Sequence, residues 1–159
     1  MVSKAGFPFN AYGAFGTFKL LIVDVRLLGA MGDIDVRTLL AGNVIFEEFT
    51  GALTEQYVLQ QLAPVPDLAI YYWSAERSTS EIDFLVQCLG KVIPIEVKAE
   101  ENLQAKSLKT FCEKYSPTIA IRTSMSDFRK EDWLTNLPLY AISELTPLIA
   151  DFQNRVLEE

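Results

Sequence analysis

The sequence predicts an α/β fold in which helices flank a mixed central sheet. From residue 44 onward, helical and extended patterns of apolar residues follow one another in the order helix, three strands, helix, strand. At the centre of this order, residues 81–86 and 92–98 alternate with period two on either side of Leu89-Gly90, which is typical of a β-hairpin. A chain of 159 residues, half of them hydrophobic, is long enough for one domain with a substantial core.

The segment that precedes this order gives weaker signals. Residues 1–17, with their glycines and a proline, predict an irregular lead-in. Residues 18–25 are apolar and β-branched enough to predict a strand, and residues 27–31 begin a short helical turn. A further turn starts at Asp35, a suitable N-terminal cap, and ends before Gly42-Asn43.

Residues 44–62 predict the first long helix, which Pro64 terminates. Apolar residues at helical spacing predict the stripe that faces the core: Phe46, Phe49, Leu53 and Tyr57. Glu55 projects from the opposite side, beside Val58 and Leu62. Because these neighbours are apolar, we expect the carboxylate of Glu55 to be partly buried.

The remaining elements follow from the same patterns. In chain order they are a strand at 68–73, a polar loop at 74–80, the hairpin, a helix at 102–115, a strand at 118–123, a charged loop at 126–132, a short strand at 139–142 and a terminal helix or tail from 145. In the helix at 102–115, the residues expected to face inward are Leu108, Phe111, Cys112 and Tyr115.

The hairpin brings ionisable residues together. If it turns symmetrically about Leu89-Gly90, Asp83 faces Glu96, and Glu81 faces Lys98. Residues two apart in a strand point the same way, so two carboxylates and an ammonium are expected on one sheet face. An ordinary cross-strand ion pair between Glu81 and Lys98 explains part of this pattern. The repulsion between Asp83 and Glu96 favours an active-site geometry instead.

An Asp on one strand followed by Glu-x-Lys on the next is similar to the active-site pattern of the PD-(D/E)xK nucleases. The predicted element order also matches their restriction-endonuclease-like αβββαβ core. The resemblance implies Mg²⁺-dependent cleavage of phosphodiester bonds, in which Asp83 and Glu96 hold the metal. By the same resemblance, Lys98 orients or activates the attacking water, and Glu55 holds a second metal or a metal-bound water.

Several stretches taken together carry a further resemblance. They are 18–20, 51–58, Tyr72-Trp73, 81–85, 93–99 and 137–142. Over residues 6–145 the chain resembles the C-terminal domain of unknown function of prokaryotic AAA+-type ATPases. The resemblance implies an ATPase module as partner, which this chain does not contain. No Gly-x-x-x-x-Gly-Lys-Ser/Thr phosphate loop occurs, so we expect no ATP hydrolysis by this chain alone. The expected organisation is a lead-in at 1–17, the domain at 18–145 and a C-terminal helix or tail at 146–159.

Composition excludes several kinds of chemistry. The chain has no histidine, which excludes Ser-His-Asp and Cys-His catalysis as well as histidine-containing zinc sites. Cys88 and Cys112 are too few for a disulfide framework and are expected to be reduced and buried. A metal in this protein would therefore be a hard cation, such as Mg²⁺, on carboxylate oxygens.

Charge and hydropathy limit the partners. The net charge of −7 disfavours strong independent binding to nucleic acid or to anionic membranes, although a partner domain could hold the nucleic acid. No apolar run reaches the roughly 18 residues that a membrane span needs. The N-terminus does not resemble a signal peptide, and we expect a cytoplasmic protein. The sequence does not indicate an oligomeric state.

Two functions therefore compete. One is a Mg²⁺-dependent nuclease or nucleic-acid-processing module, and the other is a non-catalytic interaction or assembly domain that keeps the nuclease fold as a scaffold. Tyr71, Tyr72 and Trp73 suggest a base-stacking platform, but such a strand more often divides between core and surface. Three lysines on the second helix suit phosphate contacts or, more simply, a solvated face: Lys106, Lys109 and Lys114.

Overall fold

The computed structural model describes residues 19–21, 24, 27, 30, 45–75, 80–99 and 105–158, and for 45–50 and 152–158 it describes the backbone alone. The described elements are α3 (Ile45–Leu62), β1 (Ala69–Ser74), β2 (Glu81–Cys88), β3 (Lys91–Val97), α4 (Lys106–Tyr115), β4 (Ile121–Ser124), β5 (Arg129–Lys130), β6 (Thr135–Pro138), the 3-10 helix η2 (Leu139–Glu144) and α5 (Leu145–Glu158). None of these helices has the length and hydropathy needed to cross a bilayer.

The described strands form one mixed sheet in the order β1-β2-β3-β4-β6-β5. The first three strands are antiparallel, β3, β4 and β6 are parallel, and β5 is antiparallel to β6. Helix α4 connects β3 to its parallel neighbour β4, as a parallel pair requires a crossover. The predicted α/β class with a mixed sheet and flanking helices is confirmed.

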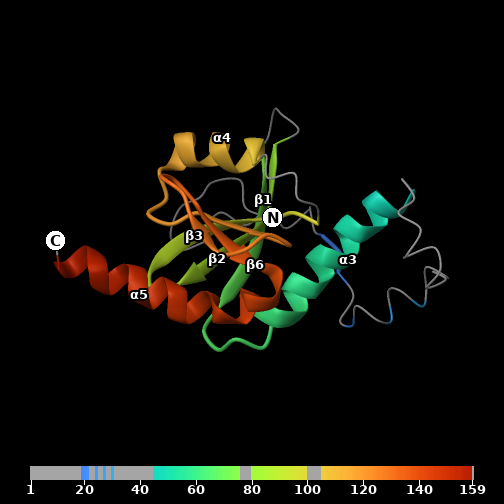
Figure 1. The fold of residues 1–159 in the computed structure, drawn as a ribbon, viewed down its shortest axis with the longest axis horizontal. Coiled ribbons are helices and arrows are strands. Elements are labelled where there is room, and N and C mark those ends of the chain that lie inside the picture. Colours follow the sequence, from blue (N-terminus) through green and yellow to red (C-terminus); the bar gives the residue numbers. More distant parts are fainter. Residues whose placement is uncertain are drawn as a thin grey trace.

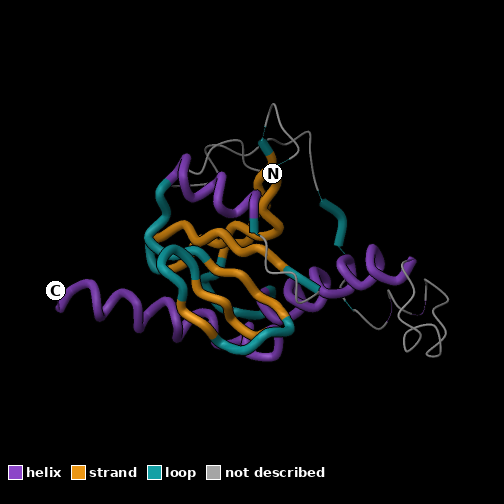
Figure 2. Tube along the Cα trace, turned by 45° about the horizontal axis from the view of Figure 1, so that its top comes forward, coloured by secondary structure: helices purple, strands orange, loops and turns teal. Residues whose placement is uncertain are grey.

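Helices cover both faces of the sheet (Figure 1). Helix α4 lies on one face, and α3 and α5 lie on the other, with the end of α5 extending past the sheet (Figures 1 and 2). The α3-side core includes Val58, Leu62, Phe84, Val86, Ile93, Ile95, Val97, Ile121, Leu137, Ile142 and Ile149. The α4-side core consists of Trp73, Ile82, Leu85, Ala105, Leu108, Phe111, Ala120 and Leu134.

The hairpin forms as predicted. Leu89 and Gly90 are its two turn residues, with φ of 49° and 75°. Positive φ at both positions is the signature of the type I′ turn, whose twist matches that of the strands. The ladder is symmetric about this turn and runs from the pair Cys88 and Lys91 to the pair Phe84 and Ile95.

A β-bulge interrupts β2 near its start. Tyr71 of β1 pairs with Leu85, but Trp73 pairs with Ile82, so two residues of β2 lie opposite one residue of β1. The core contacts agree with this shift, because Ile82 and Leu85 both join the α4-side core. In a regular strand these two side chains, three positions apart, would point to opposite faces. The bulge consists of Asp83 and Phe84, which lie opposite Tyr72, and it therefore determines the face of the sheet toward which Asp83 points.

Some expected elements differ from those found. The apolar run at 139–142 is not a strand but part of η2, whose Leu139 and Ile142 turn one face to the α3-side core. The strand beside β4 is instead β6, directly before this run. The expected loop at 126–132 contains the short edge strand β5. The C-terminal segment is a helix, and its Ile149 is fully buried.

Helix α3 has the predicted bounds to within one residue, but a different face is buried. Val58 and Leu62 are fully buried, whereas Leu53 and Tyr57 of the expected stripe are only half-buried. The side chains of Phe46 and Phe49 lie outside the described residues. Helix α3 carries apolar residues on more than one side of its C-terminal half, so helical spacing alone did not identify the face that meets the sheet.

The segment before α3 is described only in part. Of the strand expected at 18–25, residues 19–21 and Asp24 are described, and none of them has strand structure. Leu27 and Ala30 have helical backbone, in agreement with the turn expected at 27–31. The lead-in at 1–17 and the turn expected from Asp35 lie outside the described residues.

Candidate functional site

The candidate site lies where the two arms of the hairpin separate. Beyond the last ladder pair, Phe84 and Ile95, the backbone N–H of Val97 donates to Oδ2 of Asp83 at 2.8 Å. A hydrogen bond to an ionisable acceptor is stronger than a neutral one, so it fixes the carboxyl group of Asp83 at this point. We call the residues gathered here the fork site: Glu55, Asp83, Glu96 and Lys98.

Glu96 and Lys98 form an ion pair within the fork site. Lys98 Nζ lies 2.7 Å from Glu96 Oε1, and the backbone N–H of Lys98 donates to the carbonyl of Thr123 at 2.9 Å. The side chain of Glu96 is only 8% exposed, whereas that of Lys98 is 30% exposed. The second carboxylate oxygen of Glu96, Oε2, is buried and has no hydrogen-bond partner among the described residues. Glu96 is thus a buried carboxylate that, within the described part of the chain, is paired through one oxygen only.

Asp83 and Glu96 reach the fork from different sides of the sheet. Glu96 lies between Ile95 and Val97, which both join the α3-side core, so its own side chain points to the α4 side. Asp83 lines a pocket on the α3 side together with Leu59. The expectation that alternation alone puts both carboxylates on one face is therefore wrong, and the bulge in β2 is the reason.

The two carboxylates nevertheless act on each other. Burial, followed by the negative charges of Glu55 and then Glu96, raises the pKa of Asp83 from 3.8 to about 7. The Val97 N–H bond and the positive charge of Lys19 oppose this shift. Asp83 therefore holds its proton to a much higher pH than an ordinary aspartate, whose pKa is near 3.9.

Lys19 is a residue of the site that the sequence did not indicate, and Glu55 is its partner. The carboxylate of Glu55 forms an ion pair with the ammonium of Lys19, and the two side chains are 24% and 31% exposed. Burial alone would lower the pKa of Lys19, but the hydrogen bond and charge of Glu55, followed by the charges of Asp83 and Glu81, raise it. Glu55 is partly buried, as expected, and it faces the charge of Asp83. Its direct partner is a lysine.

A pocket of about 430 Å³ opens beside the fork site on the α3 side. Its lining is mainly apolar and aromatic: Lys19, Leu20, Leu21, Leu59, Ile70, Tyr71, Tyr72, Asp83 and Phe84. Ligand pockets commonly combine an apolar lining with a few polar groups in this way.

The aromatic strand divides between core and pocket. Trp73 is buried and makes edge-to-face contacts with Phe111 and Tyr115, at centroid distances of 5.2 and 5.9 Å. Trp73 is therefore a core residue and not part of a stacking platform. Lys114 lies 5.9 Å from the ring centroid of Trp73 and 5.0 Å from that of Tyr115, so it stabilises this cluster by cation–π contact. Lys106 and Lys109 are exposed on α4.

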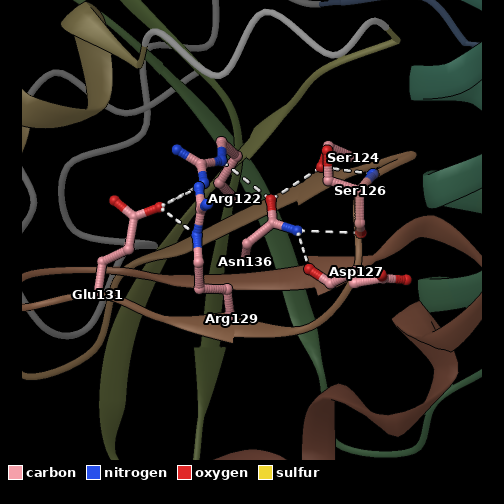
Figure 3. Close-up of polar contacts among 7 residues, drawn as sticks. All are labelled: Arg122, Ser124, Ser126, Asp127, Arg129, Glu131 and Asn136. Atoms are coloured by element: carbon pink, nitrogen blue, oxygen red, sulfur yellow. Dashed lines mark hydrogen bonds and ion pairs between the residues drawn. The ribbon is translucent and has the colours of Figure 1, made fainter.

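A buried arginine lies on the strand next to Glu96 (Figure 3). Arg122 is paired with Glu96 in the parallel β3–β4 register and is only 2% exposed. Its Nε donates to Oδ1 of Asn136 at 2.9 Å, and its Nη2 lies 2.7 Å from Oε1 of Glu131. The exposed Arg129 binds the same Glu131 oxygen at 2.9 Å. The hydrogen bond from Arg122 is the largest effect on Glu131 and lowers its pKa; burial opposes this, and the hydrogen bond from Arg129 adds a smaller lowering.

Asn136 links this arginine to the loop after β4. Its Oδ1 also accepts from Ser124 Oγ at 2.8 Å, and its Nδ2 donates to the carbonyls of Ser126 and Asp127 at 3.2 and 2.9 Å. These bonds tie the loop to the sheet at the end where β3, β4 and β6 finish. One signal in the sequence points to this network: a charged residue, Arg122, directly follows the apolar run 119–121.

The described residues contain no group of three His, Cys, Asp or Glu side chains arranged to hold a metal ion. Asp83 and Glu96 are the two acidic strand residues within reach of each other's charge, and Glu55 is held by Lys19. Any cation at the fork would thus take further ligands from backbone carbonyls or water.

Together, the fold and the site define a mixed-sheet α/β domain with an acidic cluster at the open end of its central hairpin. The family called domain of unknown function DUF4143 matches residues 50–142, and the chain belongs to this family. The match extends from within α3 to η2 and contains all four fork-site residues, but not Lys19. No curated protein matches the chain.

Proposed function

We propose that this domain has a restriction-endonuclease-like core of the PD-(D/E)xK type and acts as a divalent-cation-dependent nucleic-acid-processing module. The element order supports the proposal: α3 is followed by three antiparallel strands, then by α4 and the parallel strand β4. Asp83 and the Glu96-x-Lys98 sequence lie on the two arms of the central hairpin. By the resemblance to the C-terminal domains of AAA+-type ATPases, the module would work in the cytoplasm beside an ATPase partner.

One observation carries this proposal. Asp83, whose pKa is raised to about 7, lies within electrostatic reach of Glu96, whose Oε2 is buried with no hydrogen-bond partner in the described part of the chain. Buried carboxylates are costly unless a cation or hydrogen-bond donors compensate them. Carboxylate oxygens are also the ligands that Mg²⁺ prefers. The chemistry of these oxygens suits a hard divalent cation, and the proposal is that Asp83 and Glu96 share one at the fork, where the two strands separate, with the carbonyl of Ile95 or Val97 as a further ligand.

Each residue of the fork site has a role in this proposal. A bound Mg²⁺ would supply Lewis-acid stabilisation of the charge that develops on a phosphodiester. The hydrogen bond from Val97 holds the Asp83 carboxyl group at the fork. Glu96 holds the ammonium of Lys98, which remains partly exposed and can orient water or neutralise negative charge. Glu55 contributes negative charge from α3.

Metal binding tests the proposal. Mn²⁺ is titrated by calorimetry into the wild-type protein and into the variants Asp83→Asn, Glu96→Gln and Glu113→Gln. Glu113 is exposed on α4, so its variant is the matched control for loss of one negative charge. We expect the two fork-site variants to lose the binding that the wild type and the control keep. Equal binding by all four proteins would refute a metal site at the fork.

A nuclease assay then separates metal binding from catalysis. Lys98→Met should still bind Mn²⁺ but should lose Mg²⁺-dependent cleavage of single-stranded or double-stranded nucleic acid. The ion pair with Glu96 means that this variant needs a thermal denaturation control for folding. Cleavage that persists in Lys98→Met would remove the lysine from the mechanism.

A second candidate is a non-catalytic interaction or assembly domain that keeps the nuclease fold as a scaffold. It is favoured by the two lysines that already neutralise part of the acidic cluster, Lys98 on Glu96 and Lys19 on Glu55. It also agrees with the lack of a three-ligand group among the described residues. A wild-type protein that binds neither Mg²⁺ nor Mn²⁺ at the fork would leave this candidate.

A further inference from the structure

Lys19 reaches the acidic cluster from a distant part of the chain. It lies 36 positions before Glu55, its ion-pair partner on α3. Lys19 and Asp83 line the same pocket, and the charges of Asp83 and Glu81 both act on the lysine. Its ammonium is therefore placed in the field of three carboxylates, and it is a cation that the chain itself supplies at this location.

We propose that the ammonium of Lys19 takes the place of a second cation, so that the fork site binds one divalent cation and not two. This inference rests on the proposed metal-dependent function. It replaces the expectation from the sequence resemblance that Glu55 holds a second metal. In the structure Glu55 is held by the lysine, and a divalent cation at Glu55 would have to displace that ammonium.

The charges of the described residues agree with a single divalent cation. Four carboxylates act on one another or on the two lysines at the fork: Glu55, Glu81, Asp83 and Glu96. Against them stand the ammonium groups of Lys19 and Lys98. The excess is two negative charges when Asp83 is ionised, which one divalent cation neutralises. A second divalent cation beside Lys19 would give the cluster a positive excess, which costs free energy in a partly buried site.

The size of the effect follows from Coulomb's law. An ammonium and a divalent cation about 6 Å apart in a water-like dielectric repel by an amount that corresponds to about tenfold in affinity. Removal of the Lys19 ammonium should therefore allow a second divalent cation to bind, or should tighten the binding of the first by at least about tenfold. Removal of an exposed lysine far from the fork should do neither.

The experiment measures Mn²⁺ stoichiometry and affinity by calorimetry. We expect one Mn²⁺ per chain for the wild type and for Lys19→Arg, which keeps the charge. We expect two, or about tenfold tighter binding, for Lys19→Met. Lys109→Met, which removes an exposed lysine of α4, is the control and should match the wild type. Binding by Lys19→Met alone would overturn the proposal, because the wild-type fork site would then bind no divalent cation.

Two different failures can be told apart. If wild type and Lys19→Met bind Mn²⁺ with the same stoichiometry and affinity, and Asp83→Asn binds none, the metal site stands and the role of Lys19 is refuted. If none of the proteins binds Mn²⁺, the proposed function fails and the role of Lys19 fails with it.

A second measurement does not depend on the folding of a variant. In wild-type crystals soaked with Mn²⁺, anomalous scattering should give one peak at Asp83 and Glu96, with Lys19 still paired to Glu55. A second peak on Glu55 would overturn the proposal.

Discussion

Replacement of Asp83 by asparagine tests the electrostatics of the fork site in the metal-free protein. The change removes one negative charge from a carboxyl group that is buried near Glu55 and Glu96. It leaves an amide oxygen that can accept the same hydrogen bond from the Val97 N–H. The variant therefore isolates the charge of Asp83 with little change in shape.

The magnitude follows from the pKa of Asp83, which burial, then Glu55 and Glu96, raise from 3.8 to about 7. A carboxyl group whose pKa is higher in the folded protein binds more protons in the folded state than in the unfolded chain. The folded state consequently loses stability as the pH rises through the interval between these two values. At about 1.4 kcal/mol per pH unit, the loss is about 4 kcal/mol at most above pH 7.

Asparagine cannot ionise, so the variant escapes this loss. Its hydrogen bond to Val97 is neutral and weaker by about 1 kcal/mol than the bond to a carboxylate. At pH 8 without metal, we expect Asp83→Asn to be more stable than the wild type by about 1–3 kcal/mol, or roughly 3–10 °C in melting temperature for a chain of this size. At pH 5, which lies only about one unit above the unfolded value of 3.8, the wild type has lost about 1.7 kcal/mol, and after allowance for the weaker hydrogen bond of asparagine the two proteins should differ by less than about 1 kcal/mol.

The assay is thermal and urea denaturation of both proteins in EDTA at pH 5, 6, 7 and 8. Asp132→Asn, a change at an exposed residue, is the control and should follow the wild type at every pH. A lower stability of Asp83→Asn at pH 8 would refute the reasoning, because Asp83 would then be a stabilising partner of a cation of the chain. A stability difference that does not change between pH 5 and pH 8 would refute it equally.

Four further outcomes are expected. Arg122→Met should lower the free energy of unfolding by about 2–3 kcal/mol, because it removes a buried guanidinium that binds both Asn136 and Glu131. Arg129→Met removes an exposed partner of the same Glu131 and should change the free energy of unfolding by less than about 0.5 kcal/mol. Urea denaturation compares the two variants, and equal effects would contradict the burial of Arg122. Leu89→Asn should stabilise the hairpin by about 0.5–1 kcal/mol, because Asn before Gly90 suits the positive φ of a type I′ turn, and a lower melting temperature would contradict this turn assignment. Calorimetry should find Mn²⁺ binding by the wild type that Asp83→Asn and Glu96→Gln both lose. The same titration should find a second Mn²⁺, or about tenfold tighter Mn²⁺ binding, for Lys19→Met.

The sequence alone determined the elements whose signals are local. The first long helix was predicted at 44–62 and is found at Ile45–Leu62, because helical spacing and a following proline define its ends. The hairpin register was also predictable. A two-residue turn with glycine at a positive φ sets the pairing of everything next to it, and the ladder from Phe84 to Cys88 follows that pairing.

Local patterns did not separate alternatives that only packing distinguishes. The apolar run at 139–142 suits a strand or a helical turn, and it became part of η2 because Leu139 and Ile142 meet the α3-side core on one face. Helix α3 had apolar residues on more than one side, and contact with the sheet selected Val58 and Leu62. In both cases the choice depends on which partner surface is present, which a single segment does not encode.

The candidate site shows the same division. The sequence placed Asp83, Glu96 and Lys98 on one hairpin, because their spacing about the turn is local. Only the tertiary structure decided that a bulge against β1 turns Asp83 toward α3, and that Lys19 pairs with Glu55 across 36 positions of chain. Pairing with another strand and an ion pair between distant residues depend on free energy summed over the whole fold, and no periodicity within either segment records that sum.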